Sequence, residues 1–335
     1  MSSTVIFPAQ PEQILKGLSK VWTSLAHEEK EMGAPTVLRA CAMTLIVATD
    51  AKEGGFDESQ TISELMREHP SRGIVLTVSP DAEHDLQARV LAQCWKPFGK
   101  AQQICCEQIE ITARPESWPN VGPTLVGLTA ADLPVIFWCR HKDALSPRAA
   151  PNQTRGLEAI MNLSNKVIID TKGLDVIHAL QLIAGWQAEN HVIADLEWTR
   201  LTPWREPIAH IFDNAKRTNT LANFHTIEIA HSGERPASAL YAAGWLSAPF
   251  KARVKFRTVD GHGPGIHSLT LRSDEETIEF ERTGRDTMIL RSTNGRQREY
   301  LYTEPTLTTL MTEELSIIGT DPAFNAAFSR SLELV

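Results

Sequence analysis

The stretch KVIIDTKGLDVIHALQLIAGWQAENHVIADLEW, residues 166–198, holds two short apolar runs on either side of a helical pattern. The runs 166–170 and 191–198 have the length of β-strands, while Val176, Leu180 and Ile183 share one face of a helix. A further helix is predicted at 203–213. Strand-then-helix alternation of this kind favours a parallel sheet covered by helices.

The same reading extends in both directions along the chain. Before this stretch the pattern predicts helices at 11–31 and 61–69, and strands at 37–49, 73–78, 88–95, 102–111 and 134–140. After residue 249 it predicts short alternating segments at 252–259, 266–272, 277–282 and 287–292, typical of an antiparallel meander, and then helices at 306–318 and 322–332. The predicted class is therefore α/β, a mostly parallel sheet covered by helices, followed by a C-terminal α+β region with an antiparallel meander.

Length and charge limit what the chain can be. With 335 residues, it is expected to form two domains: an N-terminal α/β domain at 1–150, and a C-terminal α/β domain at 151–335 that ends in the meander and two helices. The net charge of −8 argues against a nucleic-acid partner. No apolar run reaches about 18 residues, and the first residues do not resemble a secretory signal, so no membrane association is expected. We expect a cytoplasmic protein.

The five cysteines have no CxxC spacing, which disfavours a zinc ribbon or a thioredoxin-type motif. Free buried thiols in a reducing compartment are the simplest expectation. The alternative is a redox role for Cys105 and Cys106, although adjacent side chains on a strand point to opposite faces.

Standard catalytic signatures are missing from the sequence. It contains no GxGxxG after a strand, no GxxxxGK[ST], no HExxH and no GxSxG, and its histidines do not pair at metal-ligand spacing. The expectation is therefore a protein with no cofactor, no metal and no catalytic residue.

The segment DLEWTRLTPWRE, residues 195–206, is the densest cluster of functional residue types. Thr202 fits a helix N-cap and Pro203 fits the first helical turn, which places the segment where sites form in parallel sheets. It contains no Ser, Cys or His for nucleophilic or acid–base chemistry. Three readings stay open: a core in which arginines neutralise the nearby carboxylates, a protein-contact surface, or an active site. The predicted partner-binding or site-shaping residues are Trp198, Arg200, Trp204 and Arg205, with Arg140 and Arg72 as weaker choices.

A second hypothesis starts from other cationic residues. Arg200, His225 and Arg235 lie at or near the ends of predicted strands, and a sugar-phosphate-binding enzyme or sensor could use them.

Six segments together resemble a known family: APTVLRACAMTLIV (34–47), HPSRGIVL (69–76), QQICCEQIEI (102–111), DLPVIFWCR (132–140), NKVIIDT (165–171) and DLEWTRLTPWRE (195–206). In this order they are similar to the OpcA family, the glucose-6-phosphate dehydrogenase assembly proteins. The resemblance covers most of residues 30–250.

The resemblance implies a non-catalytic protein without a cofactor. Such a protein binds glucose-6-phosphate dehydrogenase and promotes its assembly or allosteric activation, at the entry to the oxidative pentose phosphate pathway. No residue of this chain can be matched to a regulatory thiol of the family.

Overall fold

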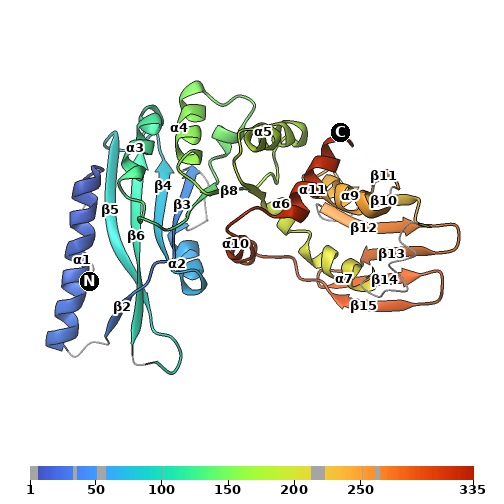
Figure 1. Cartoon of the computed structure of the whole chain (residues 1–335), viewed down its shortest axis with the longest axis horizontal. Coiled ribbons are helices and arrows are strands. Elements are labelled where there is room, and N and C mark those ends of the chain that lie inside the picture. Colours follow the sequence, from blue (N-terminus) through green and yellow to red (C-terminus); the bar gives the residue numbers. More distant parts are fainter. Residues whose placement is uncertain are drawn as a thin grey trace. The chain divides into compact units, whose positions relative to one another are not determined.

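The computed structural model describes residues 7–32, 36–50, 58–100, 102–212, 223–250, 252–260 and 265–335 (Figure 1). The chain forms two compact units. Unit 1 comprises 1–169, 186–193 and 314–319, and unit 2 comprises 170–185, 194–313 and 320–335. The predicted boundary between residues 150 and 151 stays a prediction, which limited proteolysis would test.

Sheet A confirms the predicted α/β class. Its strands follow the order β1 (Phe7–Pro8), β5 (Leu86–Trp95), β6 (Gln103–Ala113), β4 (Ser71–Val78), β3 (Met43–Asp50), β7 (Val135–Cys139), β8 (Lys166–Ile169) and β9 (Ile193–Asp195), and β2 (Val37–Arg39) pairs with β6. The pairs among β6, β4, β3, β7 and β8 are parallel, whereas β5 is antiparallel to β1 and β6. The central strands β3, β4, β7 and β8 are buried almost throughout, as expected for a parallel sheet covered on both faces.

Helices cover both faces of sheet A. Trp22 of α1 (Pro11–Met32) donates a hydrogen bond to Glu107 of β6, so α1 lies on the face toward which Glu107 points. Ser63 of α2 (Glu58–Glu68) contacts Gln93 of β5, which is paired in register with Cys106. Because Cys106 and Glu107 are neighbours on one strand, their side chains point to opposite faces. The helices α1 and α2 therefore cover opposite faces.

The remaining helices complete the two units. They are α3 (Val121–Val126), α4 (Pro151–Met161), α5 (Val176–Ala188), α6 (Leu196–Thr199), α7 (Thr202–Phe212), α9 (Ala237–Phe250), α10 (Leu307–Ser316) and α11 (Pro322–Leu332), with single 3-10 turns at Pro115–Asn120 and Lys142–Leu145. In the part of the chain that the structure describes, no helix is long and apolar enough to cross a membrane.

Sheet B forms the second layer of unit 2, with the order β11 (Arg253–Thr258), β10 (Thr226–Ser232), β12 (Gly265–Arg272), β13 (Thr277–Arg282), β14 (Thr287–Ser292) and β15 (Gln297–Leu301). The antiparallel meander is confirmed, but it consists of β12 to β15 (Figure 1). The prediction that 252–259 is the first strand of the meander is wrong, because among the described strands β11 pairs only with β10 and runs parallel to it. After β10 the chain returns through α9, a crossover that makes the next strand parallel.

One strand boundary also differs from the prediction. The run 191–198 was expected to be a strand to its end, but β9 ends at Asp195 and α6 begins at Leu196. The Asp195 carboxylate accepts the backbone N–H of Glu197 at 3.0 Å. An aspartate that caps a helix in this way ends the strand.

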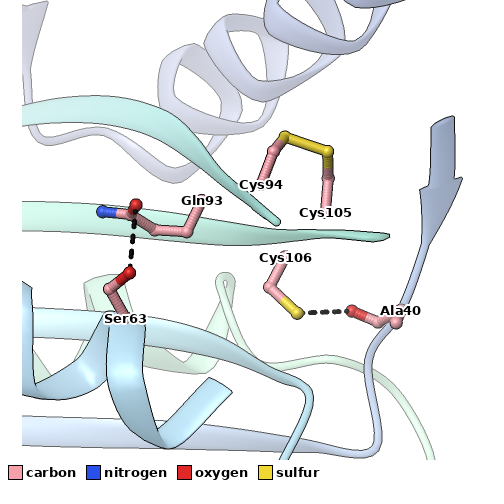
Figure 2. Close-up of a disulfide and its surroundings, with 6 residues drawn as sticks. All are labelled: Ala40, Ser63, Gln93, Cys94, Cys105 and Cys106. Atoms are coloured by element: carbon pink, nitrogen blue, oxygen red, sulfur yellow. Dashed lines mark hydrogen bonds between the residues drawn. A yellow bond between two sulfur atoms is a disulfide. The ribbon is translucent and has the colours of Figure 1, made fainter. Parts of the chain in front are cut away.

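The expectation that all cysteines are free thiols is wrong for two of them. Cys94 and Cys105 form a disulfide (Figure 2). They are directly opposite each other on antiparallel β5 and β6, with a Cα–Cα distance of 4.1 Å. Cys41, Cys106 and Cys139 are free. The sequence shows only the separation of Cys94 and Cys105, whereas the strand register brings their sulfurs together.

Candidate functional site

A cavity of about 450 Å³ lies within unit 2. Its walls come from the turn that follows Ile169, from α6 and α7, from the turn between β10 and α9, and from the residues after β15. Turns that follow strands β8 and β10 therefore contribute to it, which agrees with the placement expected for sites in α/β folds. Its volume is in the range of small-molecule sites.

The segment 195–206 forms one wall of this cavity. Arg200, Leu201 and Trp204 line it, together with Glu197. Trp198 is only 2% exposed and Trp204 only 3% exposed, so neither indole forms an exposed contact surface in this structure. The segment thus contributes to the wall of a cavity, with both of its indoles buried in the fold.

Arg200 ties this wall together. Its guanidinium donates two hydrogen bonds of 2.7 Å to Asp170 and one of 3.0 Å to Glu197. Burial alone would lower the pKa of Arg200, but its hydrogen bonds with Asp170 and the neighbouring carboxylates outweigh burial and raise that pKa. Arg200 is therefore already neutralised by carboxylates of its own chain.

Asp195, the first residue of this segment, does not line the cavity and is completely buried. It accepts hydrogen bonds from the Thr171 hydroxyl at 2.6 Å, the Tyr241 hydroxyl at 2.7 Å and two backbone N–H groups. Burial raises the pKa of Asp195 to about 7, although these hydrogen bonds act in the opposite direction. The group joins three segments of unit 2 and does not open into the cavity.

Two further contacts hold the predicted residues in place. The Arg205 guanidinium lies over the Trp198 ring, 4.0 Å from its centroid, and 3.7 Å from the Glu313 carboxylate. The Trp204 ring packs edge-on against Tyr302 at 5.9 Å. Stacking of a guanidinium on an aromatic ring is therefore present in this segment, inside the fold.

The structure brings together four of the six predicted site residues. Arg72 and Arg140 belong to unit 1, whereas Trp198, Arg200, Trp204 and Arg205 belong to unit 2. Arg72 is buried and donates to Glu107 and to the Leu128 carbonyl, both at 2.7 Å. Arg140 lies 5.4 Å from the centroid of the Trp138 ring. Their contacts indicate a structural role in unit 1.

The sugar-phosphate hypothesis is met only in part. Arg200 and Arg235 both line the cavity, but His225 does not, and it pairs with Asp274 on the surface at 3.1 Å. Arg235 is exposed and lies 4.4 Å from the centroid of the Phe256 ring, and none of the described carboxylates forms an ion pair with it.

Other cavity residues were not predicted from the sequence. Lys172, Gly233, Arg282, Tyr302 and Glu304 come from turns and strand ends far apart in the chain, without a local motif. Asp170 and Asp195, which support the cavity wall without lining the cavity, did carry a usable signal, because each ends a short apolar run. Among the described residues, no group of three or more His, Cys, Asp or Glu side chains is placed to hold a metal ion.

Comparison with known proteins decides the family. A model described as the glucose-6-phosphate dehydrogenase subunit N-terminal domain matches residues 62–184, and the corresponding C-terminal domain model matches 191–328. The chain belongs to the OpcA family.

Relatives of this OpcA chain point to the same family. The chain is 28% identical over 207 residues to a candidate OxPP cycle protein OpcA of Synechocystis sp., covering 58% of this chain and 40% of that one. It is 25% identical over 231 residues to the corresponding protein of Nostoc punctiforme, covering 66% and 47%. The chain thus spans less than half the length of these relatives.

Among solved structures, the transcriptional regulator Gal80p of Kluyveromyces lactis aligns over 88% of each chain, with 8% identity and a TM-score of 0.47. A likeness this distant supports no functional conclusion about this OpcA chain.

Proposed function

We propose that this chain binds glucose-6-phosphate dehydrogenase in the cytoplasm and promotes its assembly or allosteric activation without catalysing a reaction itself. The observation that carries the proposal is that both parts of the chain, 62–184 and 191–328, match domain models described as subunits of that dehydrogenase. A subunit of an enzyme acts on it by contact.

The chemistry of the cavity supports a non-catalytic role. Its described lining contains neither His nor Cys. Glu197 is held by Arg200 and accepts the Ser238 N–H at 3.4 Å, at the start of α9. A general base needs a free, poised group, and this carboxylate is bound on both sides.

Binding alone can activate the dehydrogenase if the chain prefers one of its states. A difference in affinity of about 1–3 kcal/mol changes the substrate affinity of the partner about 5- to 150-fold. In this proposal the cavity wall of unit 2 contributes to partner binding, and its shape is fixed by Trp198, Arg200, Trp204 and Arg205.

The proposal is tested by gel filtration of the purified chain mixed with mature dehydrogenase. An effector co-elutes with the mature enzyme, whereas an assembly chaperone that meets only new subunits does not. Absence of both co-elution and any effect on dehydrogenase assembly would contradict the proposal.

A second candidate, a sugar-phosphate sensor, is favoured by one observation. Arg235 is an exposed guanidinium at a cavity large enough for a small metabolite. Calorimetry of the isolated chain with glucose 6-phosphate and with 6-phosphogluconate separates the candidates. Micromolar binding that Arg235→Ala abolishes would favour the sensor, and no heat of binding would exclude it.

A further inference from the structure

The turn between β5 and β6 presents one apolar side chain to solvent. The Lys100 N–H donates to the Pro97 carbonyl at 3.1 Å, and Gly99 has a φ of 71°. These two features fit a β-turn that needs glycine at its third position, with Phe98 at the second. Phe98 is 105% exposed, the highest value among the large apolar side chains of the described chain.

This turn is supported close to its base. Cys94 and Cys105 are bonded across the hairpin, and the next pair toward the turn is Trp95 with Ile104 (Figure 2). Figure 1 shows the loop between β5 and β6 projecting past the ends of β3 and β4. A covalent bond at the base restricts how far the strands can separate, so Phe98 is held on a defined hairpin.

More apolar surface lies at the same end of sheet A. Trp95 is paired with Ile104, which is paired in turn with Leu38 of β2. Paired residues share a face, so the three side chains form a row on the face opposite the disulfide. Leu38 is 45% exposed, and the other two are half-buried. One exposed phenylalanine is ordinary, but here a row of three apolar side chains across three strands lies at the base of its turn and extends the apolar surface at this end of the sheet.

The charge around the patch indicates the chemistry of its partner. Lys96 and Lys100 flank Phe98 and are exposed, whereas the whole chain has a net charge of −8. An aromatic anchor between two ammonium groups fits an apolar pocket rimmed by carboxylates. The strong negative charge of the chain disfavours an anionic membrane as the partner.

We propose that the tip surface, made by Leu38, Trp95, Phe98 and Ile104 with Lys96 and Lys100, inserts Phe98 into an acid-rimmed apolar pocket of the dehydrogenase. This inference rests on the proposed function, because it names the surface through which that function acts. Phe98 is the anchor, and the lysines orient it and speed the encounter.

The experiment measures the affinity of the full-length chain for purified dehydrogenase by biolayer interferometry. Phe98→Ser is expected to weaken the affinity about 10- to 100-fold, the range of an aromatic anchor at an interface. The double variant K96E/K100E is expected to slow association and to reverse its salt dependence. Leu301→Ser, which changes an 83% exposed apolar residue of β15, is the matched control and is expected to stay within about twofold. Because Phe98 is fully exposed, its variant keeps the melting temperature of the unmodified chain.

The outcomes are distinct. If the unmodified chain binds and Phe98→Ser binds equally well, the tip surface is wrong and the proposed function stands. If the unmodified chain does not bind, this inference is overturned, and the proposed function fails as well when the chain also has no effect on dehydrogenase assembly. If Phe98→Ser leaves the affinity for the dehydrogenase unchanged, two other results would overturn the choice of partner. One is a dimer of this chain that Phe98→Ser dissociates, and the other is Phe98-dependent binding to phosphatidylglycerol vesicles.

Discussion

The hydroxyl oxygen of Tyr241 lies 2.7 Å from Oδ2 of Asp195, and both groups are completely buried in unit 2. Burial raises the pKa of Tyr241 well above 10 and that of Asp195 to about 7. The pair joins α9 to the end of β9, where the segment 195–206 that forms the cavity wall begins. The stability of this wall is therefore linked to the protonation of one carboxyl group.

Asp195→Asn tests this linkage. The folded chain holds a proton on Asp195 that the unfolded chain releases above about pH 4, so the stabilising contribution is complete below pH 4 and is lost as the pH rises through about 7. The asparagine is neutral at every pH. Its amide oxygen can accept the two backbone N–H groups, and its amide nitrogen donates to the hydroxyls of Thr171 and Tyr241 in place of accepting from them. Between pH 4 and pH 7.5 we expect the free energy of unfolding of the unmodified chain to fall by up to about 4 kcal/mol more than that of Asp195→Asn.

Urea unfolding at a series of pH values measures this difference. Asp274→Asn, at an exposed carboxyl, is the matched control and should follow the unmodified chain. Parallel pH profiles for Asp195→Asn and the unmodified chain would contradict the assignment.

The cavity wall can be tested with Trp204→Ala combined with Arg205→Ala. Removing the buried indole costs about 3–5 kcal/mol, so the variant is studied well below its melting temperature. If the wall shapes the partner site, the folded variant activates the dehydrogenase at least fivefold less than the unmodified chain does. Arg253→Ala, at an exposed position of β11, is the control. Full activation by the folded double variant would show that the wall is not part of the site.

The disulfide predicts a measurable stability difference. Replacing Cys94 and Cys105 by serine removes a cross-link with a sequence separation of 11. By loop-closure entropy this lowers the free energy of unfolding by about 3 kcal/mol under oxidising conditions. A reducing agent should lower the stability of the unmodified chain equally and leave the double serine variant unchanged, while Cys41→Ser, at a half-buried free thiol, keeps the response. If the reducing agent does not change the free energy of unfolding of the unmodified chain, the cross-link is contradicted.

Two helical glycines, one in α4 and one in α5, provide a matched pair that tests helix packing. A Cβ at Gly156 of α4 would overlap the Trp118 ring, whereas nothing lies within 4 Å of a Cβ at Gly185 of α5. We expect Gly156→Ala to destabilise by about 1–3 kcal/mol and Gly185→Ala to stabilise by about 0.5–1 kcal/mol. Thermal unfolding of the two variants measures both values, and equal shifts would contradict the described packing.

The sequence predicted which segments form strands better than it predicted which strands and which charged residues pair with one another. The buried runs of β3, β4, β7 and β8 are visible as apolar segments, because a parallel sheet is apolar on both faces. Charged and apolar residues alternate along the strands of sheet B. Arg257 pairs with Glu228 of β10, whereas the glutamates of β13 pair with Arg291 of β14. Residue spacing fixes which side a charge faces, and only the strand order fixes its neighbour.

The site was predictable only where its residues are adjacent in the chain. The segment 195–206 stood out by composition, whereas Arg282 and Tyr302 reach the same cavity from different strands. The sequence also could not show that Trp198 and Trp204 are buried, because tryptophans occur both in cores and in contacts. Burial is decided by α11 and by the residues after β15, which pack against these indoles.

The most direct test of the account is the initial rate of mature glucose-6-phosphate dehydrogenase at low glucose 6-phosphate, with and without a stoichiometric amount of this chain. We predict that the chain lowers the KM for glucose 6-phosphate at least fivefold and co-elutes with the enzyme, while the chain alone turns over no sugar phosphate. Unchanged kinetics together with separate elution, or turnover by the chain alone, would contradict it.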